Sequence, residues 1–68
     1  MADKENDRDR LISLKEVISQ TGMGKDFIYR KIKNGDFPGV VKMGRYSRWS
    51  ENEVQEWIQE RKAARSAA

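Results

Sequence analysis

Residues 21–38, TGMGKDFIYRKIKNGDFP, decide the fold of this 68-residue chain. Gly22 can take the left-handed backbone conformation of a sharp turn at little steric cost, so we expect a helix upstream to end there. A second helix, from about residue 24 to residue 34, follows the turn TGM. Gly35 ends that helix as a C-terminal cap, and Pro38 prevents its restart. Two short helices joined by a glycine-containing turn predict a helix-turn-helix.

Two capping boxes mark helices on either side of this stretch. The segment SLKE at residues 13–16 has the S-x-x-E form, in which the serine side chain caps the helix and the glutamate reaches back. Leu14, Val17 and Ile18 then follow at helical spacing, and the helix should end near Gln20. The segment SENE at residues 50–53 has the same form and begins a third helix, whose apolar face is formed by Val54, Trp57 and Ile58.

The segment between the second and third helices reads as a β-hairpin. In GVVKMGRYSRW, residues 39–49, apolar and β-favouring residues lie on both sides of a turn at Gly44–Arg45. A very short strand is expected at Leu11 and Ile12. The predicted fold class is therefore mainly α with a small β-hairpin: a winged helix-turn-helix of three helices plus a wing.

The domain organisation follows from the ends of the chain. Residues 1–10 alternate acidic and basic side chains and hold no apolar residue after Met1 and Ala2, which predicts a disordered N-terminal tail. Residues 11–65 form the single predicted domain, and residues 66–68 are expected to fray.

The composition excludes several classes of protein. The chain has no cysteine and no histidine, so disulfides and thiolate metal sites are excluded and the usual general base is missing. Glu53 and Glu56 could be imagined as an acid/base pair, but they lie on a short, solvated helix. We therefore expect no enzyme, no cofactor, no metal and no small-molecule substrate. No apolar run approaches the ~20 residues of a membrane span, which favours a cytoplasmic, nucleoid-associated protein of bacteria and no membrane partner.

The positive charge is concentrated in the middle of the chain. The net charge is +3 in total, but residues 24–49 carry +5 and the flanking segments carry the opposite sign or none. A concentrated positive field suits a polyanion, and nucleic acid is the first candidate.

The second helix separates apolar from polar side chains. With about 100° per residue, Ile28 and Ile32 fall about 40° apart and define the buried face, while Arg30 falls at about 200°. In the major groove of B-DNA, Arg can bond guanine, Asn can bond adenine and Asp can accept from cytosine. The simpler alternative is a solvated amphipathic helix without a ligand. The candidate DNA-binding residues of this helix are Lys25, Asp26, Phe27, Arg30, Lys31, Lys33 and Asn34.

Phe27 and the hairpin each allow two interpretations. Phe27 either touches a thymine methyl or completes the core at the edge of the helix. The hairpin, as a wing, would contact phosphates or the adjacent minor groove, although turn chemistry and an exposed edge strand would explain the same residue types. Trp49 and Trp57 are predicted core residues rather than base-stacking platforms. The candidate DNA-binding residues of the wing are Lys42, Arg45, Tyr46, Ser47 and Arg48.

Five segments occur in order without gaps: LKEV, TGM, IYRKIKNGDFP, VKMGRYSRW and SENEVQEWI. Together they resemble the AlpA-type regulators of phages and prophages, which are related to the winged-helix domains of excisionases and MerR regulators. The resemblance implies a transcriptional regulator or an excision factor. It also implies DNA contacts from the start and outer face of the second helix and from the wing, here Lys25, Asp26, Phe27, Arg30, Lys31 and residues 45–48.

The sequence departs from the family pattern at two positions. Gly24 stands where the family usually has a serine-type cap, and Phe27 stands where a small polar residue is commoner. Both lie where bases would be read, so the resemblance does not carry over a target sequence.

The sequence leaves three functions open. The first is a sequence-specific regulator that binds double-stranded DNA, and the second is an excisionase-type architectural factor that directs recombination. The third, of another class, is a protein-interaction module that uses the third helix, with its edge of Glu53, Glu56 and Glu60; alternatively, the apolar face of that helix packs on the first two. The sequence has no heptad or other dimerisation signal, which leaves the oligomeric state open: a monomer in solution with several protomers on DNA is one arrangement that fits, and RNA polymerase or an integrase is a candidate partner.

Overall fold

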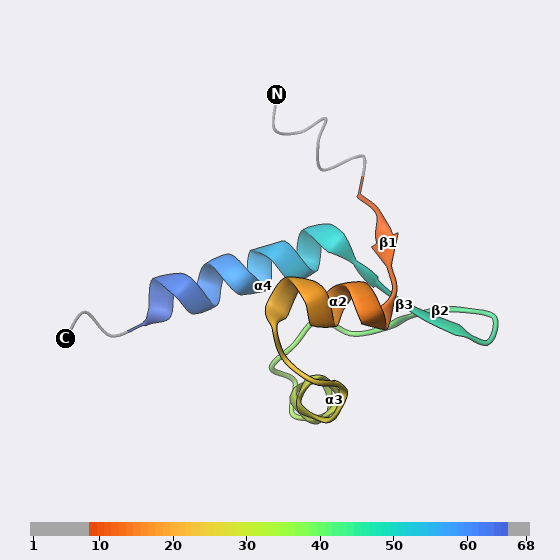
Figure 1. Cartoon of the computed structure of the whole chain (residues 1–68), viewed down its shortest axis with the longest axis horizontal. Coiled ribbons are helices and arrows are strands. Elements are labelled where there is room, and N and C mark those ends of the chain that lie inside the picture. Colours follow the sequence, from red (N-terminus) through yellow and green to blue (C-terminus); the bar gives the residue numbers. More distant parts are fainter. Residues whose placement is uncertain (1–8, 66–68) are drawn as a thin grey trace.

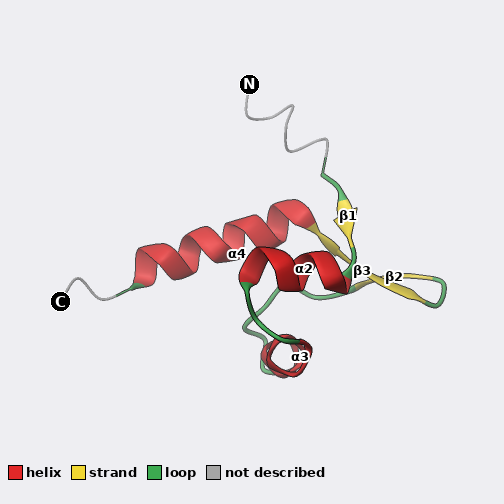
Figure 2. Cartoon of the chain, in the orientation of Figure 1, coloured by secondary structure: helices red, strands yellow, loops and turns green. Residues whose placement is uncertain are grey.

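The computed structural model of the chain describes residues 9–65, so residues 1–8 of the predicted tail and the predicted frayed end at 66–68 lie outside the described residues. The elements follow the predicted order, with three helices and a small antiparallel sheet (Figures 1 and 2). The expected winged-helix architecture is confirmed. The elements are β1 (Leu11–Ile12), α2 (Leu14–Thr21), α3 (Lys25–Lys33), β2 (Val41–Met43), β3 (Tyr46–Ser50) and α4 (Glu51–Ala64).

The turn between α2 and α3 forms as its glycine predicts. Gly22 has a φ of 74°, and its N–H donates to the carbonyl of Ile18 at 2.8 Å. The hydroxyl of Thr21 accepts from the N–H of Met23 at 3.1 Å and so closes the start of the turn. At the other end of α2, the Ser13 hydroxyl caps the helix by accepting from the N–H of Glu16 at 3.2 Å.

The C-terminal end of α3 is a Schellman motif. The N–H of Asp36 donates to the carbonyl of Lys31 at 2.8 Å, and the N–H of Gly35 donates to the carbonyl of Ile32 at 3.0 Å. Gly35 has a φ of 80°, which glycine adopts without the penalty of a Cβ atom. This cap turns the chain sharply toward the hairpin.

The wing is the pair β2–β3, and β3 also pairs with β1 on its other edge. Val41 lies opposite Arg48 and Met43 lies opposite Tyr46, so the connection is the predicted two-residue turn. Gly44 takes a φ of 63° at the first turn position, which matches a hairpin turn with glycine there. The hairpin projects from the helical body (Figure 1).

The core draws on every helix, on β1 and β3 and on the loop after α3, but not on β2, whose residues are exposed. Trp49 on β3 is fully buried, as predicted, so the wing strand is anchored at the centre of the molecule. Trp57 is half-buried and donates its indole N–H to the carbonyl of Asp36 at 2.6 Å, which joins α4 to the end of α3. The buried apolar residues are Ile12, Val17, Ile28, Phe37, Trp49 and Val54.

Two residues that the sequence placed in the predicted tail, Asp9 and Arg10, make specific contacts. The Asp9 carboxylate accepts from the Ser50 hydroxyl and, at 2.9 Å, from the N–H of Asn52. The Arg10 guanidinium donates to both carboxylate oxygens of Glu51, at 2.9 and 3.0 Å. The cause is the β1–β3 pairing, which places the residues before β1 beside the N-terminus of α4 (Figure 1).

Candidate nucleic-acid interface

The outer face of α3 is polar and open to solvent. Ile28 is buried and Ile32 is half-buried against the core, so the predicted inward face of the helix is confirmed. The opposite face, which we call the outer face, carries two cations, a carboxylate and an amide side chain, all exposed: Asp26, Arg30, Lys33 and Asn34.

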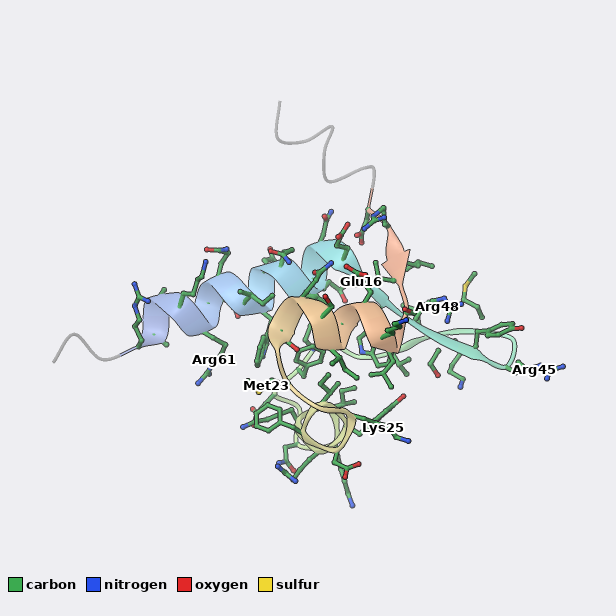
Figure 3. All side chains as sticks on the ribbon, viewed as in Figure 1. Glu16, Met23, Lys25, Arg45, Arg48 and Arg61 are labelled. Carbon is green, nitrogen blue, oxygen red and sulfur yellow. The ribbon has the colours of Figure 1, made fainter. Side chains whose placement is uncertain are left out.

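One flank of α3 is fixed to the wing strand. Tyr29 packs edge-on against Trp49, with ring centroids 6.0 Å apart and an interplanar angle of 66°. Lys25, one turn earlier on the same flank, is exposed (Figure 3). Because Trp49 belongs to β3, this contact and the packing of Ile28 in the same core position the helix relative to the hairpin.

The other flank of α3 faces α4. Phe27 is half-buried and lines a hollow with Lys31, Trp57 and Arg61. The cationic groups of Arg30 and Lys31 lie 5.7 and 5.4 Å from the centroid of the Phe27 ring. Of the seven residues predicted on this helix, Phe27 and Lys31 therefore lie at the boundary with α4 rather than on the outer face.

The wing presents its polar side chains along both strands. Arg45 and Tyr46 are exposed at the turn, and Figure 3 shows Arg45 at the tip. The Lys42 ammonium donates to the Ser47 hydroxyl at 3.2 Å. Arg48 is half-buried; its guanidinium lies 5.2 Å from the Tyr46 ring and donates to the Ser47 carbonyl at 2.9 Å. These contacts hold Lys42 and Arg48 close to the strands, whereas Arg45 extends freely.

The cations of α3 and the wing are not neutralised within the described part of the chain. Across residues 9–65 the ion pair within 4.0 Å is that of Arg10 with Glu51, at the N-terminus of α4. The positive charge of α3 and the hairpin therefore remains available to an external anion. In the same part of the chain, no three His, Cys, Asp or Glu side chains are placed to hold a metal ion. Nor is any helix there long and apolar enough to cross a membrane.

Comparison with known proteins assigns the chain to a family. Residues 10–62 match the family model described as prophage CP4-57 regulatory protein (AlpA). The chain belongs to the AlpA family. This confirms the resemblance found in the sequence, and the match spans all the described elements from β1 to most of α4.

Curated relatives of this AlpA-family chain carry two kinds of name. It is 44% identical over 41 residues to the response regulator inhibitor for tor operon of Escherichia coli strain K12. It has the same identity over the same length to the probable excisionase hkaC of Shigella phage Sf6 and of Enterobacteria phage HK620. The matched segment covers 60% of this chain and 62% of each relative.

Sequence reasoning gave no role to two residues that shape the interface of this AlpA-family chain. The contact of Tyr29 with Trp49 depends on where the hairpin packs, which the pattern of one helix does not contain. Phe37 is buried and packs edge-on against Trp57, with centroids 4.8 Å apart. Its partner Trp57 lies on α4, so this contact too depends on how the helices pack.

Proposed function

We propose that this AlpA-family protein binds double-stranded DNA as a sequence-specific regulator, with α3 in the major groove and the wing on the backbone or adjacent minor groove. One observation carries the proposal: the exposed face of α3 and the basic hairpin are fixed to each other through the Tyr29–Trp49 contact. A helix and a hairpin held in one arrangement can contact adjoining parts of a duplex together.

Specificity would come from the outer face of α3. Arg30 and Asn34 lie one turn apart on that face. An arginine side chain can form two hydrogen bonds with guanine, and an asparagine side chain can form two with adenine. Asp26 on the same face can accept from the amino group of cytosine. Phe27 stands at the edge of this surface, where it could reach a thymine methyl only near the boundary with α4. These four residues are the proposed base-reading set.

Affinity would come from cations that meet phosphates. Lys25 and Lys33 are exposed at the two ends of α3, and Arg45 is exposed at the tip of the wing. Backbone contacts of this kind position a protein on DNA without reading its sequence. Lys31, Lys42, Tyr46, Ser47 and Arg48 complete the proposed contact surface.

A selection of bound sequences from random duplex DNA, followed by footprinting, tests the proposal. We expect a short preferred sequence, because a single recognition helix reads only a few base pairs, and we expect more than one protomer on each natural site. If about five cations meet phosphates, log K against log salt should have a slope of roughly −4.5. No enriched sequence together with a slope near zero would contradict DNA binding.

A second function on the same surface is an excisionase-type factor that directs site-specific recombination. The name of the matched phage relatives, probable excisionase, favours it. Promoter output in cells that lack the recombinase separates the two functions. A regulator would change that output, with RNA polymerase as its partner. A directionality factor would leave it unchanged and would be needed for excision by an integrase.

A further inference from the structure

We propose that a groove between the α2–α3 turn and the C-terminal half of α4 binds an acidic segment of a partner protein that carries a large apolar side chain. This groove, the α4 groove, has a volume of about 390 Å³. Its floor is formed by the apolar side chains of Met23, Phe27, Trp57 and Ile58. The proposal concerns a surface outside the proposed DNA-binding set except at Phe27, and its test does not require DNA.

The floor is open because α4 is longer than the body that it packs against. Val54 in its first turn is buried and Trp57 and Ile58 are half-buried, but every residue from Gln59 to Arg65 is exposed. Figure 1 shows the C-terminal half of α4 extending past α2 and α3. Met23, in the turn that faces it, is 37% exposed. A flexible thioether beside two half-buried aromatic rings is an adaptable surface for another apolar side chain.

The rim of the groove is cationic. Arg61, Lys62 and Arg65 line it from α4, and none of the residues that line the groove is acidic. Cations near a helix C-terminus also interact favourably with the helix dipole, and this alone would explain why they lie in the last turns of α4. The dipole does not account for the apolar floor beside them. An apolar hollow bordered by cations matches a segment in which carboxylates flank a large apolar residue.

A second hollow restricts how such a segment could lie. On the other edge of Trp57, a hollow of about 340 Å³ is lined by four carboxylates, those of Asp36, Glu53, Glu56 and Glu60. Like charges placed together are costly, so an acidic segment would be excluded from this side and confined to the α4 groove.

DNA fits the α4 groove less well than a protein segment does. A phosphate backbone would satisfy the cationic rim, but it carries no apolar group for the floor. Figure 3 shows Met23 and Arg61 on the side of α3 away from Arg45 at the tip of the wing. A partner in the groove would therefore leave the outer face of α3 and the wing open, and partner and DNA could bind together.

Peptide selection by the full chain tests the proposal. The probe is a display library of random peptides of about 12 residues, long enough for a few turns of helix or an extended strand. We expect enriched peptides in which Asp or Glu flank Leu, Phe or Trp. They should bind Arg65→Glu about tenfold more weakly, because like charges would then meet at the rim. They should also bind Met23→Asp more weakly. Lys15→Glu, the same charge change at an exposed position on α2, should bind them as the unaltered chain does.

Nuclear magnetic resonance locates the bound peptide with internal controls. The chain has two tryptophans, and an enriched peptide should shift the indole N–H signal of Trp57 but not that of the fully buried Trp49. Among the methionines, the methyl signal of Met23 should shift, while that of Met43 on the wing should not.

Four outcomes would overturn the proposal. The first is that the selection does not enrich peptides in which acidic residues flank a large apolar residue. The second is that the enriched peptides bind Arg65→Glu, Met23→Asp and the unaltered chain equally well. The third outcome combines two results: duplex DNA alone shifts the methyl signal of Met23, and Arg65→Glu binds DNA more weakly than the unaltered chain. Together they would assign the groove to the DNA interface. The fourth is a shift of the Met23 and Trp57 signals with protein concentration alone, which would assign it to a second copy of the chain.

Discussion

Tyr29 on α3 packs edge-on against Trp49 on β3, with ring centroids 6.0 Å apart, and thereby joins the helix to the strand of the wing. Trp49 is fully buried, whereas Tyr29 is 40% exposed. Its ring therefore forms part of the surface where α3 meets the hairpin. Together with Ile28 and Ile32, which pack α3 into the core that contains Trp49, this ring helps to hold the two proposed DNA-binding elements in one arrangement.

Removal of the Tyr29 ring should affect both stability and DNA binding. We expect Tyr29→Ala to lower the free energy of unfolding by about 1–3 kcal/mol, because the aromatic pair and the buried part of the ring are both lost. Affinity for a selected duplex should fall as well, because α3 and the wing would no longer be held in one arrangement. Denaturant unfolding and a binding titration measure the two effects. Tyr29→Phe keeps the ring and should be close to the unaltered chain; equal affinities of the Ala and Phe variants would contradict the coupling.

Arg30 should determine preference at one base position. Because it lies exposed at the middle of the outer face of α3, Arg30→Ala should cost about 1–3 kcal/mol of binding free energy and relax preference at one position of the site. Binding to a set of single-substitution duplexes measures the change. The matched control is Lys15→Ala, which removes an exposed cation from α2. Equal weakening on every duplex would make Arg30 a phosphate contact instead.

Arg45 at the tip of the wing should act without regard to sequence. Arg45→Ala is expected to weaken binding to all duplexes by a similar factor and to flatten the salt slope by about one unit, since one phosphate contact is lost. Titrations at several salt concentrations give the slope. An unchanged slope would place the tip of the wing away from the backbone.

Glu51 links stability to pH. Hydrogen bonds from Arg10 and Gln20 lower the pKa of its carboxyl from 4.5 to about 2. A depressed folded-state pKa stabilises the fold fully above pH 4.5, and this contribution is lost as pH falls toward 2. Glu51→Gln should therefore lower the free energy of unfolding by about 1 kcal/mol at neutral pH, as expected for a partly exposed ion pair with a further hydrogen bond. Urea unfolding across the acidic range should show the two proteins converging; a constant difference would contradict the assignment.

The glycine that begins α3 should be replaceable, unlike the glycine of the turn. Gly24 is the N-cap residue, has no side-chain capping bond, and a Cβ added there would meet no atom within 4 Å. Gly24→Ser should stabilise the chain by a few tenths of a kcal/mol because the hydroxyl can accept from the first turn of α3. Gly22→Ala should instead destabilise it by about 1 kcal/mol, because Gly22 has a φ of 74°. Thermal unfolding of both variants measures the two changes in stability. A change of the same sign in both variants would contradict the prediction.

Local signals in the sequence predicted most of the fold. Gly22, Gly35 and the two serine caps end or begin helices through contacts within a few residues, so the sequence determines them directly. The burial of Trp49 also followed from its place between a strand and a cap. The ion pair of Arg10 with Glu51 could not be predicted, because the two residues are 41 positions apart in the sequence and come together only after β1 pairs with β3.

The candidate site was predictable in composition but less so in geometry. The spacing of Ile28 and Ile32 indicated correctly that Arg30 faces solvent. The position of Phe27 depends on where α4 crosses α3, and no periodicity within one helix contains that information. The same limit applies to Met23, whose surroundings depend on how α4 packs beside the α2–α3 turn.

In the proposed complex with DNA, the outer face of α3 and the wing form one binding surface. The most direct measurement is a backbone amide titration of the full chain with its selected duplex, followed by nuclear magnetic resonance. We predict that the largest shifts occur at Lys25–Lys33 and at residues 41–48, with little change along the exposed side of α2 around Lys15 and Ser19. Large shifts on that side of α2, with α3 and the hairpin unaffected, would contradict the claim.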